Sequence, residues 1–289
     1  MIEFVQNYPN MFVLTAGLVG LVAGSFLNVV IYRLPVMMEN EWRRECESFL
    51  ESEETAEATA SFNLMVPRSR CPNCNHSIAA YENIPVLSYV ILGGKCSACK
   101  NQISARYPVV EFFCGLISVA VALHFGFSAA GVSALILSWA LVVLALIDFD
   151  TQLLPDSITL PLLWAGIVAN YNGTFVTLEE SILGAIFGYL SLWMVFWGFK
   201  LATGKDGMGY GDFKLLAVLG AWLGWHILPL VIVLSSVVGA TIGISMMVFA
   251  SHDKTKPIPF GPYLAISGWI AMLWGDEIMQ RYMIGSGAL

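Results

Sequence analysis

Long apolar segments fill most of the chain, and short stretches with Pro, Gly and charged residues separate them. A membrane-spanning helix needs about 20 mostly apolar residues. The pattern predicts spans at residues 11–32, 108–125, 129–147, 158–171, 181–199, 213–226, 229–250 and 260–274. The fourth, sixth and eighth segments are short, so seven spans remain an alternative to eight. No Lys or Arg precedes the first segment, which favours a retained helix over a removed signal peptide.

Composition supports a membrane protein. Of the 289 residues, 57% are hydrophobic and only 12% are charged, against about 25% charged in soluble domains. The net charge of -7 says little about partners, because nine of the 21 acidic residues lie before residue 58. No basic patch indicates nucleic-acid binding. We therefore expect membrane lipid, and no nucleic acid, around this chain.

Basic residues indicate which loops face the cytoplasm, since loops rich in Lys and Arg stay on that side. With eight spans and the N-terminus outside, 13 of the 14 basic residues lie inside or at that border, and only Arg281 lies outside. The loop of residues 34–107 is then cytoplasmic, and its acidic part, residues 39–60, reads as a solvated helical insertion. We predict an all-α polytopic protein with three parts: a first transmembrane helix (1–34), a small cytoplasmic domain (35–106) and a helical bundle (107–289).

Two cysteine pairs in this cytoplasmic loop have the spacing of a structural zinc site. The pairs are C-x2-C motifs with 21 residues between them: Cys71 with Cys74, and Cys96 with Cys99. Four thiolates around one zinc ion would fold a segment too small to have a core. Disulfides are the alternative, which a reducing cytoplasm disfavours. His76 is not needed as a ligand, and Cys46 and Cys114 have no expected role.

Acidic residues directly after or before apolar segments are the second chemical signal, because ionisable groups at membrane depth are functional candidates. Asp148 follows the third predicted span, and Asp212 precedes the sixth in a GxGD sequence. In the charge-derived topology both face the cytoplasm. Two neighbouring carboxyl groups share a proton, so one donates it to a peptide carbonyl while the other activates water. The alternative is that both acids are loop residues at the water interface.

The glycines of the GxGD sequence and the other nearby acids have simpler interpretations. Gly209 and Gly211 leave the backbone free to adopt strained angles and to approach a substrate closely. The remaining acids read as interfacial loop residues that balance Lys205 and Lys214; they are Asp150, Asp156 and Asp206.

Six stretches resemble the bifunctional type IV prepilin peptidases, which belong to the GxGD class of membrane aspartic proteases. They are residues 24–28 with 32–35 (GSFLN, YRLP), 67–74 (PRSRCPNC), 103–111 (ISARYPVVE), 148–156, 207–216 (GMGYGDFKLL) and 259–263 (PFGPY). They occur in family order over most of the chain. The resemblance implies that Asp148 and Asp212 are the catalytic aspartates of an enzyme in the bacterial inner membrane, with a periplasmic N-terminus and a cytoplasmic active site.

The resemblance also implies substrates and cofactors. Such enzymes remove the leader of type IV prepilins or pseudopilins after a Gly, then N-methylate the new N-terminal residue with S-adenosylmethionine. The complete cysteine pattern is similar to that of the bifunctional members. Positions in or beside the motifs are the candidates for binding the methyl donor, each with a structural role as its alternative: Gly24, Asn28, Arg33, Gly94 and Glu111.

Two other functions account for part of the same pattern. A proton-coupled transporter would use Asp148 and Asp212 as a relay, although the halves of the chain show no inverted repeat. A zinc-bearing membrane scaffold for a secretion or pilus machine would leave the GxGD sequence unexplained. Substitution of either aspartate separates the three hypotheses.

Overall fold

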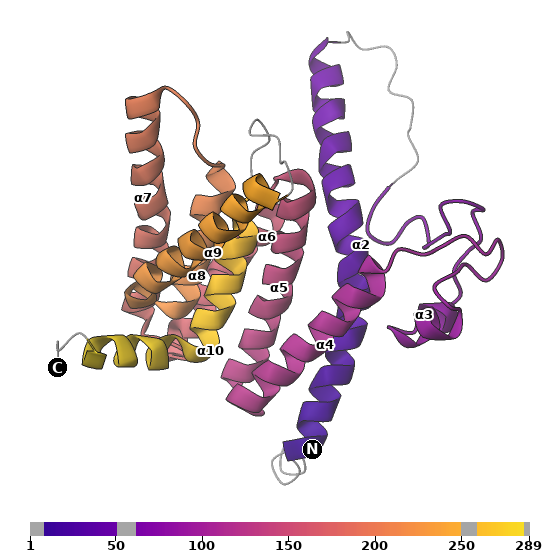
Figure 1. Ribbon diagram of the computed structural model, residues 1–289, viewed down its shortest axis with the longest axis horizontal. Helices are drawn as coiled ribbons and strands as arrows, with labels where there is room; N and C mark the ends of the chain where they lie inside the picture. Colours follow the sequence, from indigo (N-terminus) through magenta and orange to yellow (C-terminus); the bar gives the residue numbers. More distant parts are fainter. Residues whose placement is uncertain (1–8, 51–61, 250–258, 286–289) are drawn as a thin grey trace. The chain divides into compact units, whose positions relative to one another are not determined.

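The computed structural model describes residues 9–50, 62–249 and 259–285 (Figure 1). The chain forms two compact units, residues 1–126 and 127–289. The helices of the first unit are α2 (Pro9–Leu50), the short 3-10 helix η1 (Ala80–Asn83), α3 (Leu87–Ile91) and α4 (Arg106–Phe125). Those of the second are α5 (Ala129–Thr151), α6 (Asp156–Ala169), η2 (Asn170–Asn172), α7 (Leu178–Thr203), α8 (Tyr210–Leu223), η3 (Trp225–Ile227), α9 (Leu228–Phe249) and α10 (Gly261–Gly285).

Eight long helices overlap the eight apolar segments predicted from the sequence. Among the described helices, five are long and apolar enough to cross a membrane: Asn10–Phe49, Arg106–Phe125, Ala129–Thr151, Leu178–Thr203 and Trp225–Ser245. α6 and α8 have 14 residues each, about 21 Å of helix against a hydrocarbon core of about 30 Å. The all-helical membrane class is confirmed, whereas the count of eight spans stays a prediction.

The first helix is longer than its apolar segment. α2 has 42 residues and continues through Pro35, which gives about 63 Å of helix. Residues 41–49 are exposed and include several Glu and Arg, which favour helix. The helix therefore runs into the predicted acidic insertion, of which residues 51–60 lie outside the described residues. The domain boundaries at residues 34 and 106 stay predictions.

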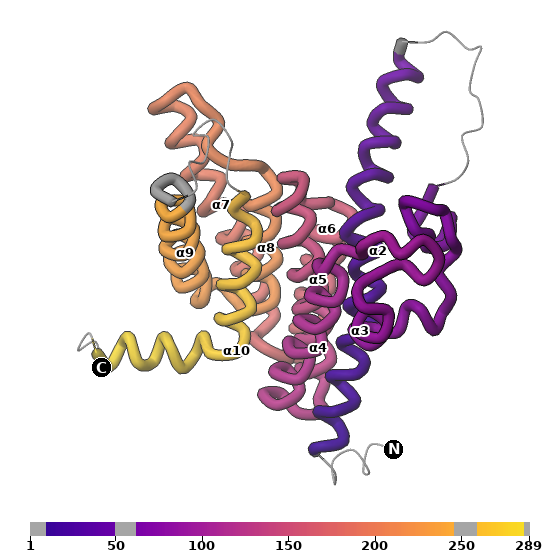
Figure 2. Tube along the Cα trace, turned by 45° about the vertical axis from the view of Figure 1, so that its right-hand side comes forward, coloured from indigo at the N-terminus to yellow at the C-terminus, as the bar shows by residue number. Residues whose placement is uncertain are grey.

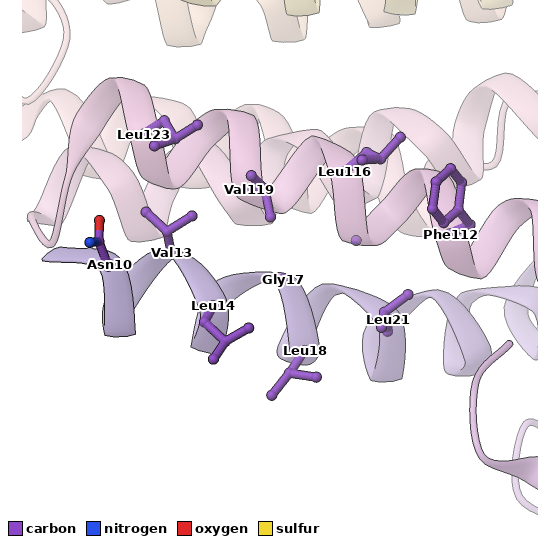
Figure 3. A pocket seen from close by; sticks show the side chains of 11 residues that line it. Asn10, Val13, Leu14, Gly17, Leu18, Leu21, Phe112, Leu116, Val119 and Leu123 are labelled. Atoms are coloured by element: carbon purple, nitrogen blue, oxygen red, sulfur yellow. The ribbon is translucent and has the colours of Figure 1, made fainter. Parts of the chain in front are cut away.

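Glycines on one face of α2 bring it against α4. Gly17, Gly20 and Gly24 are spaced three and four apart and so share that face. A Cβ at Gly24 would lie 2.7 Å from the Cα of Glu111, so only glycine permits this approach. A cleft of about 510 Å³ lies between the two helices, and Val13 and Val119 point across it (Figure 3).

In the second unit, α8 is a short helix covered by its neighbours. Ten of its 14 residues are buried, and it packs against α6, α7 and α10 (Figures 1 and 2). Gly184 of α7 and Gly220 of α8 touch backbone to backbone, where neither position has room for a Cβ. A helix that is apolar on every side must be buried in this way. The first turn of α8, which carries Asp212, is therefore held inside the unit.

Candidate active site and metal centre

Asp148 lies in the last turn of α5 and is buried, with 5% of its surface exposed. The helix ends four residues later at Gln152, whose backbone is left-handed (φ 57°) and whose amide donates to the Asp148 carbonyl at 2.8 Å. This is a common way to end a helix. Asp150, two residues further on, is exposed, because positions two apart on a helix face different directions.

Asp212 lies in the first turn of α8 and is 6% exposed. Its own amide donates to the carbonyl of Gly209, the residue that precedes the helix, at 3.3 Å. A Cβ at Gly211 would lie 2.7 Å from the Cβ of Leu154, so this glycine allows the start of α8 to approach the segment after α5. The expectation of strained glycine angles is wrong, because neither Gly209 nor Gly211 has a positive φ; close approach explains Gly211 instead.

The two buried aspartates form an electrostatic pair within the second unit. The charge of Asp148 acts on the carboxyl group of Asp212, although 64 positions separate them in the sequence. A third element completes the site, since the amide of Gly261 at the start of α10 donates to Oδ2 of Asp148 at 2.9 Å. α10 packs against both α5 and α8 (Figure 1). Such a buried pair can hold and share one proton, as the chemistry of an aspartic protease requires.

The other acids of this region form ion pairs closer to the surface. Lys214 donates to both carboxylate oxygens of Asp156, at 2.6 and 2.7 Å. Asp206 pairs with Lys200 at 2.8 Å, and 70% of the Asp206 side chain is exposed. The expected balance between Asp156 and Lys214 is therefore present, while Asp206 pairs with Lys200 instead of Lys205.

The four predicted metal ligands meet in the first unit. Their sulfur atoms all lie within 4.8 Å of one another, with 3.8 Å between those of Cys71 and Cys99 and 4.0 Å between those of Cys74 and Cys96. All six cysteines of the chain are free, so the disulfide alternative is not supported. Zinc bound tetrahedrally at about 2.3 Å would hold its sulfurs about 3.8 Å apart. The donor set fits a four-thiolate metal site.

The two cysteine turns have the same backbone construction. In the first, the Cys71 carbonyl accepts from the amide of Asn75, whose φ is 56°. In the second, the Cys96 carbonyl accepts from the amide of Lys100, whose φ is 61°. An isolated β-bridge closes each turn. Two equivalent loops thus present two sulfurs each to one point.

The electrostatics of the four sulfurs favour a bound cation. The backbone amide of Asn101 lowers the pKa of the Cys99 thiol to about 6. The amide of His76 also favours the Cys74 thiolate, but burial and the neighbouring sulfurs outweigh it and raise the pKa of Cys74 to about 12. Four thiolates cannot share this space unless a positive ion lies among them. His76 itself faces Glu82, with 3.3 Å between Nε2 and Oε2, and is not one of the cluster.

Four of the five candidate methyl-donor residues have structural partners. Asn28 donates to the Tyr107 carbonyl at 3.1 Å, and the Val86 amide donates to Glu111 at 2.8 Å. Arg33, only 8% exposed, donates at 2.8 and 2.6 Å to carbonyls of the loop at positions 63 and 67. Gly24 packs against α4, as described above. Their polar groups hold the loop to α2 and α4, which explains these residues without a ligand.

Gly94 is the exception, because it lines a cavity of about 490 Å³. The other lining residues are Tyr89, Gly93, Gln102, Ile103, Ser104 and Ala105. Gly94 has a φ of 69°, a backbone that residues with a Cβ rarely adopt. A Cβ there would also lie 2.9 Å from the Tyr89 ring. Gly94 therefore lines a space large enough for a small molecule.

Comparisons with known proteins identify the family. The first part of the chain, residues 18–125, matches the model of the bacterial peptidase A24 N-terminal domain, and residues 135–244 match that of the type IV leader peptidase family. The chain is 56% identical to the prepilin leader peptidase/N-methyltransferase of Stutzerimonas stutzeri, over 98% of this chain and 97% of the relative. The chain belongs to the type IV leader peptidase family. No solved structure matches it.

Other relatives of the type IV leader peptidase family are equally complete matches. The proteins of the same name from Pseudomonas aeruginosa and Aeromonas hydrophila are 54% and 53% identical, over 99% and 98% of each chain. The predicted resemblance is therefore confirmed, and the transporter alternative has no support. Sequence reasoning did not identify Gly261 or Tyr89 as site residues. The PFGPY stretch was a signal for Gly261, whereas nothing in the sequence distinguished Tyr89.

Proposed function

We propose that this chain is a membrane aspartic endopeptidase that removes the leader of type IV prepilins or pseudopilins and N-methylates the new N-terminal residue. The observation that carries the peptidase proposal is the buried pair of Asp148 and Asp212, which two separate helices bring together in the second unit. Membership of the type IV leader peptidase family and the names of the relatives support the same chemistry. The basic loops favour an inner-membrane orientation with this site at the cytoplasmic face.

In this proposal the two aspartates activate water. One carboxylate takes a proton from the water, and the hydroxide oxygen bonds to the carbonyl carbon of the leader glycine. The other, protonated aspartate gives its proton to the carbonyl oxygen. The carbon–nitrogen bond then breaks as the leaving amine takes a proton from the first aspartate, and one hydroxyl of the tetrahedral intermediate returns a proton to the second aspartate as the new carboxyl group forms. Burial keeps bulk water away from the pair, which strengthens its electrostatic effect on the developing charge.

For the second activity we propose the cavity beside Gly94 as the methyl-donor site. S-adenosylmethionine supplies a methyl group to the free amine that cleavage creates. The absent side chain at Gly94 and the phenol ring of Tyr89 shape the cavity. Arg33 and Glu111 then position the surrounding loop by holding its backbone groups. Methyl transfer is thereby assigned to the first unit and peptide cleavage to the second.

We further propose that Cys71, Cys74, Cys96 and Cys99 hold a structural zinc ion. The sulfur spacing and the matching backbone turns support this assignment. Four thiolates leave no open coordination position for water or substrate. The metal would therefore stabilise the loop that carries Gly94, and we give it no part in either reaction.

The proposed function is tested by intact-mass measurement of a prepilin incubated with the purified protein and S-adenosylmethionine. We expect a mass loss equal to the leader and a gain of one methyl group, with neither change for Asp212→Asn. The exposed residue Asp150 provides a matched control, since Asp150→Asn should behave as the wild type. Leader loss without methylation would refute the methyl-transfer proposal alone. An unchanged mass with several pilin substrates would refute the peptidase proposal.

A further inference from the structure

The start of α10 makes one contact with the aspartate pair that the mechanism above leaves unexplained. Gly261 is the first residue of α10 and is buried. Its amide donates to Oδ2 of Asp148 at 2.9 Å, across 113 positions of sequence. The first amides of a helix have no acceptor within the helix and need one elsewhere. The structure therefore joins an unsatisfied donor of α10 to a proposed catalytic oxygen of α5.

The other amides of this turn are already accounted for. Pro262 has no amide hydrogen. The amides of Tyr263 and Leu264 both approach the carbonyl of Phe260, at 3.1 and 3.2 Å. Among the first four residues of α10, only Gly261 is thus left to donate to Asp148.

The position also has no room for a side chain. A Cβ on Gly261 would lie 2.7 Å from Oδ2, 3.0 Å from Cγ and 3.3 Å from Cβ of Asp148. All three atoms belong to the aspartate itself, so any larger residue must push the carboxyl group or the start of α10 away. The backbone of Asp148 gives little freedom to adjust, because its carbonyl accepts the Gln152 amide that ends α5.

We propose that Gly261 is a positioning residue for peptide cleavage, whose amide holds Oδ2 of Asp148 and leaves Oδ1 to contact the attacking water. This inference rests on the proposed peptidase function. An oxygen that faces an amide hydrogen is an acceptor and does not carry the shared proton. The hydrogen bond therefore fixes both the rotation of the carboxyl group and the oxygen that exchanges protons.

The first test compares Gly261→Ala with Gly275→Ala in purified full-length protein. Gly275 provides a matched steric control on the same helix, because a Cβ there would crowd Ile227 at 2.6 Å. We expect kcat for leader removal to fall about 100-fold in Gly261→Ala, since a small misplacement of a reacting group costs that much. KM should stay near the wild-type value because Gly261 acts on Asp148 and not on the substrate. The two variants should melt at similar temperatures.

A second variant separates the hydrogen bond from the steric effect. An ester in place of the amide between Phe260 and Gly261 removes the donor hydrogen and adds no atom. We expect kcat to fall about 10- to 100-fold, the value of one hydrogen bond to a charged group. This variant keeps the inference testable if Gly261→Ala does not fold.

The outcomes distinguish the inference from the function on which it rests. Equal kcat values for Gly261→Ala and Gly275→Ala, or an unchanged kcat in the ester variant, would overturn the positioning role alone. A rise in KM without a fall in kcat would also overturn it, because that result indicates substrate binding. A wild-type protein that does not cleave prepilin would overturn the peptidase proposal and this inference together.

Discussion

The cysteine loop of residues 62–105 and helix α8 are held in place by different means. Within this loop only three residues are buried: Cys71, Gly94 and Cys96. In α8, by contrast, ten of 14 residues are buried against neighbouring helices. Two of the three buried loop residues are proposed metal ligands, so the loop has almost no apolar core. Its stability must come from a few specific bonds, whereas that of α8 comes from close packing.

Because of this difference, we expect different substitutions to abolish the two proposed activities. In these proposals the Gly94 cavity lies in a loop that the metal site stabilises, whereas Asp212 lies in a helix held by close packing. A change at the cysteines should act on methyl transfer, and a change in the second unit should act on cleavage.

Loss of the metal should unfold the cysteine loop. Cys74→Ser removes one of the four thiolates, so we expect bound zinc to be lost. The loop should then unfold, because a structural zinc ion contributes about 10–16 kcal/mol to folding in small zinc domains. Metal content by mass spectrometry and limited proteolysis within residues 62–105 measure the effect. Methylation of a pre-cleaved pilin should stop with it. The exposed Cys46 provides the control, since Cys46→Ser should keep both the metal and the protease resistance.

Two results with Cys74→Ser would contradict these expectations. Full zinc retention by Cys74→Ser would show that another residue completes the site. Equal loss of leader removal and methylation in that variant would contradict the separation of the two activities, because Cys74 lies in the other unit from the aspartates.

Removal of either buried carboxylate should stop cleavage without loss of folding. We expect Asp148→Asn and Asp212→Asn to lower kcat for leader removal by at least about 10²- to 10⁴-fold, the usual contribution of a positioned acid or base. Thermal unfolding should change little, because Asn keeps the shape of the side chain. The measurement is the rate of leader loss beside the exposed variant Asp150→Asn. Near-normal cleavage by either Asn variant would refute the aspartate pair.

The meeting of the four cysteines and the burial of the two aspartates could be predicted from the sequence, because local spacing and adjacent apolar segments indicate them. A C-x2-C pair brings two sulfurs to one turn wherever it folds, and the structure places Cys71, Cys74, Cys96 and Cys99 in one cluster. Asp148 adjoins a strongly apolar helix, so its burial followed from its position in the chain. The apolar segments predicted the eight long helices for the same reason.

Contacts between distant backbone groups could not be predicted. The amide of Gly261 has no side-chain signal, and its bond to Asp148 depends on where α10 begins. Asn28, Arg33 and Glu111 were candidate ligand contacts, but each is bonded to backbone atoms of its own unit. The sequence identifies such residues as motif positions. Only the fold shows whether their side chains contact a ligand or other parts of the protein. The apolar pattern predicts only residues 11–32 of the first helix, because the later turns of α2 are polar and exposed.

Substitution of Asn170 tests how much buried hydrogen bonds add to the stability that packing gives the second unit. This side chain is fully buried, and its Nδ2 donates to the carbonyls of Ala221 and Trp222, at 2.9 and 3.0 Å. Asn170→Ala would leave these groups at the end of α8 without donors, which should cost about 1–3 kcal/mol of stability. Unfolding in mixed detergent, compared with the exposed variant Asn172→Ala, measures the loss. Equal stability would show that packing alone holds α8.

The ion pair of Asp156 and Lys214 should have the smallest effect, although it lies near Asp212 in the chain. The side chains are 54% and 29% exposed, and ion pairs of this kind contribute up to about 1 kcal/mol. We therefore expect Asp156→Asn to lower stability slightly and to leave kcat for cleavage close to that of Asp206→Asn, which removes a similar surface pair. High salt should reduce the difference from wild type, since it screens exposed charges. A loss of cleavage as large as that of Asp212→Asn would instead place Asp156 within the active site, because a surface ion pair cannot account for an effect of that size.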